Sequence, residues 1–190
     1  MKNAVIVSGA TLIVALCAVP LAASAETEGG EAALANALKQ ANLSLEQGIA
    51  ASAREGVPIS AKYEAEDDDA DELQLSVYTM KSGSSDVDFE TGDVRPREAS
   101  FTEVIVDYAT GKIGKVIPIK DGEDLAAARN QSKAMAQSRR SLESATAQAV
   151  SANSGYRAVS VTPGLKDGRP VAKVTLLNGS EWKTVYEALD

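Results

Sequence analysis

Histidine is absent from the chain, and cysteine occurs once, at Cys17. Without histidine there is no imidazole for general base catalysis or for the usual zinc sites, and one cysteine cannot form an intramolecular disulfide. Basic residues are also scarce: 19 face 27 acidic residues, a net charge of −8 that disfavours nucleic-acid binding. The missing residue types therefore exclude most familiar catalytic centres and point away from DNA and RNA.

The first 25 residues have the pattern of a secretory signal peptide. Lys2 precedes an uncharged, mostly apolar stretch, Pro20 breaks that stretch, and Ala23-Ser24-Ala25 matches the small-x-small cleavage pattern. We expect cleavage before Glu26, export to the periplasm or the medium, and no stable membrane span in the mature chain. An uncleaved anchor is the alternative, because about 20 apolar residues can span a bilayer, but Pro20 favours cleavage.

The expected mature chain has an uneven charge. Residues 26–110 hold 6 basic and 19 acidic side chains, a net of −13, whereas residues 111–190 hold 12 and 8, a net of +4. Such asymmetry predicts an acidic loop together with a separate partner surface.

Two stretches of the chain resemble each other, which predicts an internal duplication. Ser44-Leu45-Glu46 recurs 97 residues later as Ser141-Leu142-Glu143, and the same spacing aligns Ala61 with Ala158 and Val77 with Val174. Residues 102–110 then match 182–190 at a spacing of 80, so the first copy holds 17 extra residues. The predicted division is a signal peptide at 1–25, a helical lead-in at 26–42, a first repeat at 43–120 with an inserted loop at 81–100, a connecting helix at 121–140, and a shortened second repeat at 141–190.

The first copy is predicted to be a helix followed by antiparallel strands. Ser44 and Gln47 form a capping box, and Leu45, Ile49 and Ala53 form the inward stripe of a helix that ends near Gly56. The predicted strands are residues 59–66, 73–79, 101–108 and 113–119. Pro118 cannot donate to a strand ladder, so the last strand is expected at a sheet edge.

The second copy is predicted from the same signals. A helix over 124–137 either continues through 141–151 or precedes a second helix, Gly155 ends it, and strands follow at 156–162, 171–177 and 181–188. Pro163-Gly164 and residues 166–169 are expected to form a loop. Val159 and Val161 oppose the phase that the spacing of 97 gives to Tyr156 and Ala158, so either a bulge or a different register is required.

The run Val104-Ile-Val-Asp107-Tyr-Ala-Thr-Gly111-Lys-Ile, after the helix that begins Leu43-Ser-Leu-Glu-Gln, resembles the PepSY family. The Asp-x-x-Thr-Gly-Lys turn is its most recognisable local feature, and residues 141–190 resemble a shorter copy without the terminal turn. The resemblance implies an α+β fold of two tandem repeats, each a helix packed on a small antiparallel sheet. It also implies a module that binds and restrains a protein partner, as in peptidase propeptides, and it brings no catalytic residues.

Acidic residues concentrate in the predicted hairpin at 64–72, where seven of nine residues are acidic. Asp67, Asp69 and Asp71 have the first spacings of an EF-hand and are weak metal candidates. The loop would then need a glycine at its sixth position and a glutamate at its twelfth, and the chain has Glu72 and Tyr78 there. A solvated hairpin tip is the favoured interpretation, because its charges oppose edge-to-edge pairing of sheets.

The remaining polar motifs are weak. Ser60-Ala-Lys62 and Ser132-Lys133 have the composition of a Ser–Lys dyad but fit ordinary strand and helix surface. Lys133, Arg139 and Arg140 would suit an anion, although a solvated helix face is the favoured interpretation. The sequence therefore predicts no catalytic residues and no cofactor. The predicted partner is a protein, with a peptidase as the candidate. The predicted function is non-enzymatic protein binding, with peptidase inhibition or modulation as its form, and a divalent-cation-responsive envelope protein using residues 64–72 is the alternative.

Overall fold

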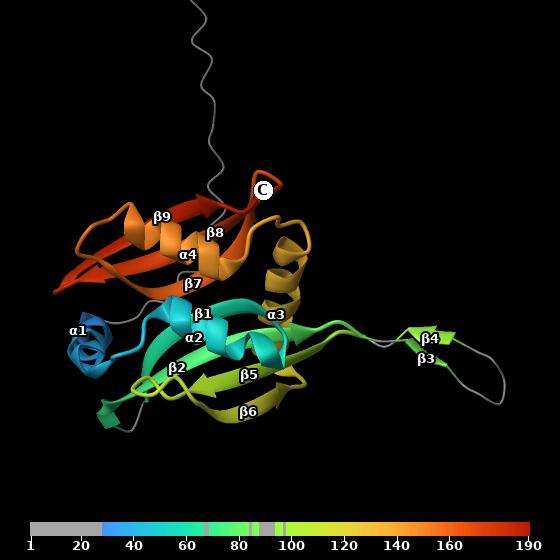
Figure 1. Ribbon diagram of the computed structural model, residues 1–190, viewed down its shortest axis with the longest axis horizontal. Helices are drawn as coiled ribbons and strands as arrows, with labels where there is room; N and C mark the ends of the chain where they lie inside the picture. The colour runs from blue at the N-terminus through green and yellow to red at the C-terminus, as the bar shows by residue number, and fades with distance from the viewer. Residues whose placement is uncertain (1–27, 67–68, 84, 88–93, 97) are drawn as a thin grey trace, which may run out of the picture.

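The computed structural model describes residues 28–190 except 67–68, 84, 88–93 and 97, so the predicted signal peptide lies outside it (Figure 1). The fold is mixed α/β, with helices packed on a seven-stranded antiparallel sheet of order β6-β5-β2-β1-β7-β8-β9. This confirms the predicted combination of helices with antiparallel strands, but the strands predicted as two small sheets form one continuous sheet, because β1 pairs with β7. The elements are α1 (Glu28–Ala37), α2 (Leu45–Ser52), β1 (Val57–Glu66), β2 (Asp69–Lys81), β3 (Ser85–Val87), β4 (Val94–Pro96), β5 (Ser100–Val106), β6 (Ile113–Ile119), α3 (Gly122–Met135), α4 (Leu142–Ser151), β7 (Arg157–Lys166), β8 (Arg169–Asn178) and β9 (Glu181–Ala188).

The capping box at the start of α2 is confirmed. The Ser44 Oγ accepts from the Gln47 backbone N–H, and the Gln47 Oε1 accepts from the Ser44 N–H, so two otherwise unpaired amides are satisfied. Leu45 and Ile49 are buried as predicted. Ala53 is exposed, however, because the helix ends at Ser52 and a 3-10 turn follows.

A β-bulge near the start of β1 changes which side chains share a face. Ala61 and Tyr63 point into the core under α2, as the alternation predicts. Pro58 pairs with Thr79 but Ser60 already pairs with Tyr78, so Ile59 is the extra residue. Ile59 therefore joins a second small core on the other face of the sheet, with Phe101 of β5 and Ala128 of α3.

The turn between β5 and β6 has the conformation that its sequence predicts. The Asp107 Oδ1 accepts from the backbone N–H of Ala109 at 2.9 Å and of Thr110 at 2.8 Å. These bonds hold the pKa of Asp107 below its ordinary value. Gly111 has φ 71°, and β6, which contains Pro118, lies at an edge of the sheet as expected.

The predicted inserted loop at 81–100 contains a small sheet of its own. Strands β3 and β4 pair with each other, and Figure 1 shows them extending away from the seven-stranded sheet. The first half of the sheet therefore carries an arm between β2 and β5.

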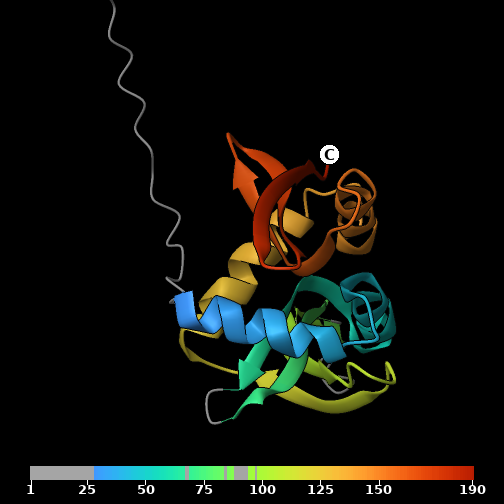
Figure 2. The same cartoon turned by 90° about the vertical axis from the view of Figure 1, so that its left-hand side faces the viewer.

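The chain then crosses from the β6 edge to the second half of the sheet. Helix α3 packs against β7, β1 and β2, on the face opposite α2. It stops at Met135, and α4 begins separately, with the Ser141 Oγ accepting from the Ser144 N–H as an N-cap. Figure 2 shows α2 and α4 on one side of the molecule, where they contact each other, and α3 on the other.

The structure corrects the predicted register of β7. A bulge lies between Ala158 and Ser160, and Val161 pairs with Val174 as Ala61 pairs with Val77. Val159 is the extra residue at this bulge. Val161, and not Ala158 as the spacing of 97 predicted, therefore has the place in the β7–β8 pairing that Ala61 has in the β1–β2 pairing.

The predicted loop at 163–169 is too long. Strand β7 runs through Pro163 and Gly164 to Lys166, and only Asp167 and Gly168 turn, both with positive φ. Proline is tolerated inside this strand because β1 pairs with β7 only at Val161 and Ser160, so beyond them β7 has a neighbour on the β8 side alone.

Candidate functional site

The three metal candidates of the acidic hairpin fall on a part of the chain whose side chains lie outside the described residues. Asp67 lies outside the described residues, and so do the side chains of Asp69 and Asp71, although their backbone forms the start of β2. Among the residues whose positions are described, no group of three or more acidic residues is placed to hold a metal ion.

The two Ser–Lys pairs have other partners. The Ser60 Oγ donates to the Gln131 Oε1 of α3 at 2.9 Å, and the Lys62 ammonium forms an ion pair with Glu64 at 2.5 Å. The Ser132 Oγ lies 2.8 Å from the Met80 sulfur. In both places the hydroxyl joins α3 to the sheet, so these serines are explained by packing.

Arg140 departs from the predicted solvated helix face. It lies between α3 and α4, where its guanidinium donates to the Ala188 carbonyl at 3.0 Å and to the Gln148 Oε1 at 2.7 Å. The backbone N–H groups of Arg139 and Arg140 both donate to the Leu189 carbonyl. This segment therefore fastens the end of β9 to α4.

A polar cluster lies on the face of the sheet opposite α2. The Ser76 Oγ accepts from Gln74 and donates to Glu64, and Lys62 lies over the Tyr78 ring. Burial, together with the nearby carboxylates of Glu103 and Glu64, raises the pKa of Tyr78 well above its usual range. Tyr78 is therefore a neutral phenol at physiological pH, and the cluster offers hydrogen bonds and no activated nucleophile.

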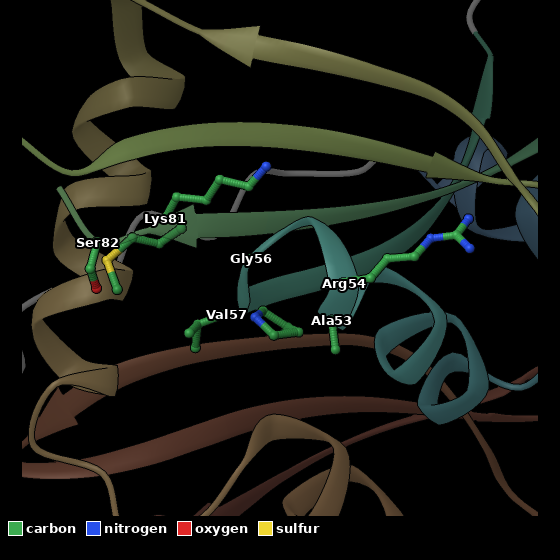
Figure 3. A pocket seen from close by; sticks show the side chains of 8 residues that line it. Ala53, Arg54, Gly56, Val57, Lys81 and Ser82 are labelled. Atoms are coloured by element: carbon green, nitrogen blue, oxygen red, sulfur yellow. The ribbon is translucent and has the colours of Figure 1, made fainter. Parts of the chain in front are cut away.

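An apolar pocket opens where α2 ends and β1 begins. It measures about 630 Å³, and its walls come from the end of α2, the start of β1 and the end of β2. Val57 is one of its lining residues and is 51% exposed. Figure 3 looks into this pocket, which is lined by Ala53, Arg54, Gly56, Val57, Pro58, Met80, Lys81 and Ser82.

A second hollow of about 150 Å³ adjoins the first and shares Ala53, Val57 and Pro58 with it. Its other walls are Ile49 of α2, Met135 at the end of α3, and residues 141–143 at the start of α4. Together the two hollows form one groove, here called the junction groove, across the boundary between the two halves of the sheet.

Charged side chains border both parts of the junction groove: Arg54 and Lys81 line the larger hollow, and Glu143 of α4 lines the smaller one. Glu55 lies 3.8 Å from the Arg54 guanidinium and 3.9 Å from the Lys81 ammonium. Figure 3 shows the Arg54 and Lys81 side chains extending away from Val57 and Ala53. Exposed ion pairs of this kind contribute little to stability.

Sequence reasoning did not find the junction groove. Val57 and Met135 lie about 80 residues apart in the chain, and their proximity depends on how α3 crosses the sheet. The available signal was Gly56-Val57-Pro58, an apolar residue between a helix end and a proline.

Comparison with known proteins leaves the chain without an assigned family: no family model matches it, and no curated protein or solved structure shows a significant match. Among the described helices, none combines the length and the apolar character needed to cross a membrane.

Proposed function

We propose that this chain is an exported, non-enzymatic module that binds another protein and restrains it, as an inhibitor or modulator of a peptidase. The observation that carries the proposal is the junction groove. It is open and mostly apolar, it is bordered by a few charged side chains, and its lining includes Val57, an aliphatic residue that is 51% exposed. An exposed apolar surface of this kind is typical of a site where another chain docks.

The proposal includes a duplicated PepSY-like module. In its support, α2 is followed by β1, β2 and β5, and α4 is followed by β7, β8 and β9, each set in the same order. Both helices begin at a serine cap, and both first strands carry a bulge near their start. The strand order is the mirror image about the β1–β7 boundary, apart from the added edge strand β6.

Sheet edges provide a second surface for the proposed partner. Strand β9 is an edge strand of eight residues, paired with β8 alone, and its Tyr186 is 53% exposed. Edge strands accept additional strands through backbone hydrogen bonds, whereas an apolar groove gives specificity. The net charge of −13 over residues 26–110 also attracts basic surfaces, so association is expected to be faster at low salt.

The test is a pull-down from an envelope extract of the source organism, with the mature chain from Glu26 as bait. Three baits are compared: the wild-type chain, Val57→Asp in the junction groove, and Leu165→Asp at the β7–β8 turn. Val57 and Leu165 are 51% and 48% exposed, so both aspartates are expected to be tolerated by the fold. Mass spectrometry should identify a partner, a peptidase on this proposal, that Val57→Asp loses and Leu165→Asp retains.

A kinetic assay follows on the identified peptidase. Inhibition should be reversible and stoichiometric, and its onset should slow as salt is added. Turnover of peptidase, esterase or phosphatase substrates by the purified chain, abolished by replacing one serine, would contradict the proposal. A partner captured equally by all three baits would place the docking surface elsewhere than the junction groove.

A further inference from the structure

A second pocket lies at the other end of the β1–β7 boundary, where β7 begins. It measures about 370 Å³, and its walls come from α1 and the 3-10 turn after it, from the start of β7, and from the β8–β9 turn. This volume is in the range of small-molecule sites. The residues that line it are Ala35, Leu38, Lys39, Gly155, Tyr156, Arg157, Leu177, Asn178 and Gly179.

Arg157 is held rigidly in this pocket. Its Nη1 donates to the Leu38 carbonyl at 2.7 Å and, more weakly, to the Ala41 carbonyl at 3.5 Å, while its Nη2 donates to the Leu43 carbonyl at 3.1 Å. The guanidinium also lies 5.7 Å from the centre of the Tyr63 ring. A half-buried arginine fixed in this way has already lost its rotamer freedom, so a ligand need not order it.

The positive charge of Arg157 is not neutralised by these contacts. Carbonyl oxygens are neutral acceptors, and no carboxylate of a described residue forms an ion pair with Arg157. A guanidinium has five N–H donors, and the carbonyl oxygens of Leu38, Ala41 and Leu43 together accept three hydrogen bonds from them. The pocket thus contains a preorganised cation in a protein of net charge −8.

Further basic groups surround the same pocket, and its lining contains no acidic residue. Lys39 lines it directly, and its ammonium donates to the Asn36 Oδ1 nearby. Lys183 lies 5.6 Å from the centre of the Tyr156 ring, beside the pocket. The Glu181 carboxylate lies near the Tyr156 hydroxyl and raises the pKa of that phenol.

The rest of the lining is complementary to a peptide. Leu38 and Leu177 are buried side chains that form an apolar wall, and the Asn178 amide has a donor and an acceptor, as a peptide group does. We propose that this pocket binds the C-terminal carboxylate of a peptide chain whose last side chain is apolar. The carboxylate contacts Arg157 and Lys39, the last side chain contacts Leu38 and Leu177, and Asn178 bonds to the preceding peptide group. This inference rests on the proposed function: the peptide C-terminus that the pocket binds belongs to the proposed partner protein.

The test measures binding of a fluorescein-labelled pentapeptide, Gly-Ser-Gly-Ser-Leu, by fluorescence anisotropy with the full mature chain. The free acid should bind at least about tenfold more tightly than the C-terminal amide, since a charge-assisted bond is lost in the amide. Lys39→Glu should weaken binding of the free acid by about tenfold or more. Lys120→Glu, on the far side of the molecule after β6, changes the net charge equally and should leave binding unchanged.

Each of four results would overturn the inference. Three concern the peptide: no binding of the free acid, equal binding of acid and amide, or equal weakening by Lys39→Glu and Lys120→Glu. The fourth concerns 4-methylpentanoate, which has the carboxylate and the apolar chain but no peptide group: if it binds with the affinity of the peptide, the pocket is a site for small acids. The pull-down separates this inference from the proposed function. A partner captured equally by wild type and Lys39→Glu leaves the proposed function standing and removes this pocket from it.

Discussion

Gly56 is the residue whose replacement tests the connection between α2 and β1. It joins the 3-10 turn after α2 to β1, with φ 149° and ψ −178°, a region that only glycine occupies at low cost. A Cβ at this position would lie 2.8 Å from the carbonyl oxygen of Met80 and 3.0 Å from its carbonyl carbon. These are backbone atoms of β2, and Met80 pairs with Val57, so they cannot rotate away as a side chain would.

The expected cost of Gly56→Ala follows from these two effects. The disfavoured backbone conformation costs about 1–3 kcal/mol. Moving the β2 backbone costs about another 1–3 kcal/mol, as for other overpacked sites. The more restricted unfolded chain returns about 0.4–1 kcal/mol. The net loss is therefore about 1–6 kcal/mol, with a middle value of about 3 kcal/mol, a large part of the roughly 5–15 kcal/mol that stabilises a typical domain.

Urea unfolding measures this loss, with the fluorescence of Trp182, the single tryptophan, as the probe. At a slope of about 2 kcal/mol per molar urea, the middle of the usual range, a loss of about 3 kcal/mol should lower the midpoint by about 1.5 M. Gly164→Ala is the matched control, because no atom lies within 4 Å of its added Cβ and its φ is not positive. Equal midpoints for the two variants would refute the assigned geometry of the α2–β1 connection.

Three further predictions concern the turn, the acidic hairpin and the leader. Asp107→Ala should lower the free energy of unfolding at pH 7. Because folding lowers the pKa of Asp107, urea titrations at a series of pH values should show the difference from wild type shrinking as the pH falls below 3.8, the ordinary pKa of this carboxyl. Replacing Asp67, Asp69 and Asp71 by asparagine should not lower the melting temperature at neutral pH. A variant that melts several degrees lower than a wild-type chain whose stability depends on added calcium would contradict the solvated-tip interpretation. Intact-mass measurement of the exported protein should give a chain that begins at Glu26, and a retained or lipid-modified cysteine would contradict it.

Local chemistry made several features predictable from the sequence. Ser44 with Gln47 specified a helix start, because the two side chains satisfy amides only a few residues away. Asp107 with Gly111 specified a turn for the same reason. Pro118 marked an edge strand because it cannot donate to a second neighbour.

Long-range features could not be predicted in this way. The bulges at Ile59 and before Ser160 depend on how each strand fits its neighbours, and hydrophobic alternation does not show which residue is extra. Pro163 reads as a loop residue in sequence, and it is accepted in β7 because β1 has already separated from that strand. The role of Arg157 is likewise invisible, since its acceptors lie more than 110 residues earlier in the chain.

The acidic hairpin could be predicted from the sequence, whereas the junction groove could not. The acidic hairpin is visible as a run of charges, because its residues are adjacent in the chain. The junction groove is assembled from α2, β1, α3 and α4, so it exists only once the two halves of the sheet have met. Val57 is exposed there by tertiary structure and not by any local polarity.

Site-specific photo-crosslinking tests most directly the claim that this chain binds a protein through the junction groove. A benzophenone amino acid is placed at Val57 in one strain and at Leu165, of matched exposure, in another, and living cells are irradiated. The account predicts one discrete adduct with a partner protein from position 57 and none from position 165. No adduct from position 57 in cells that export the protein, or the same adduct from both positions, would contradict it.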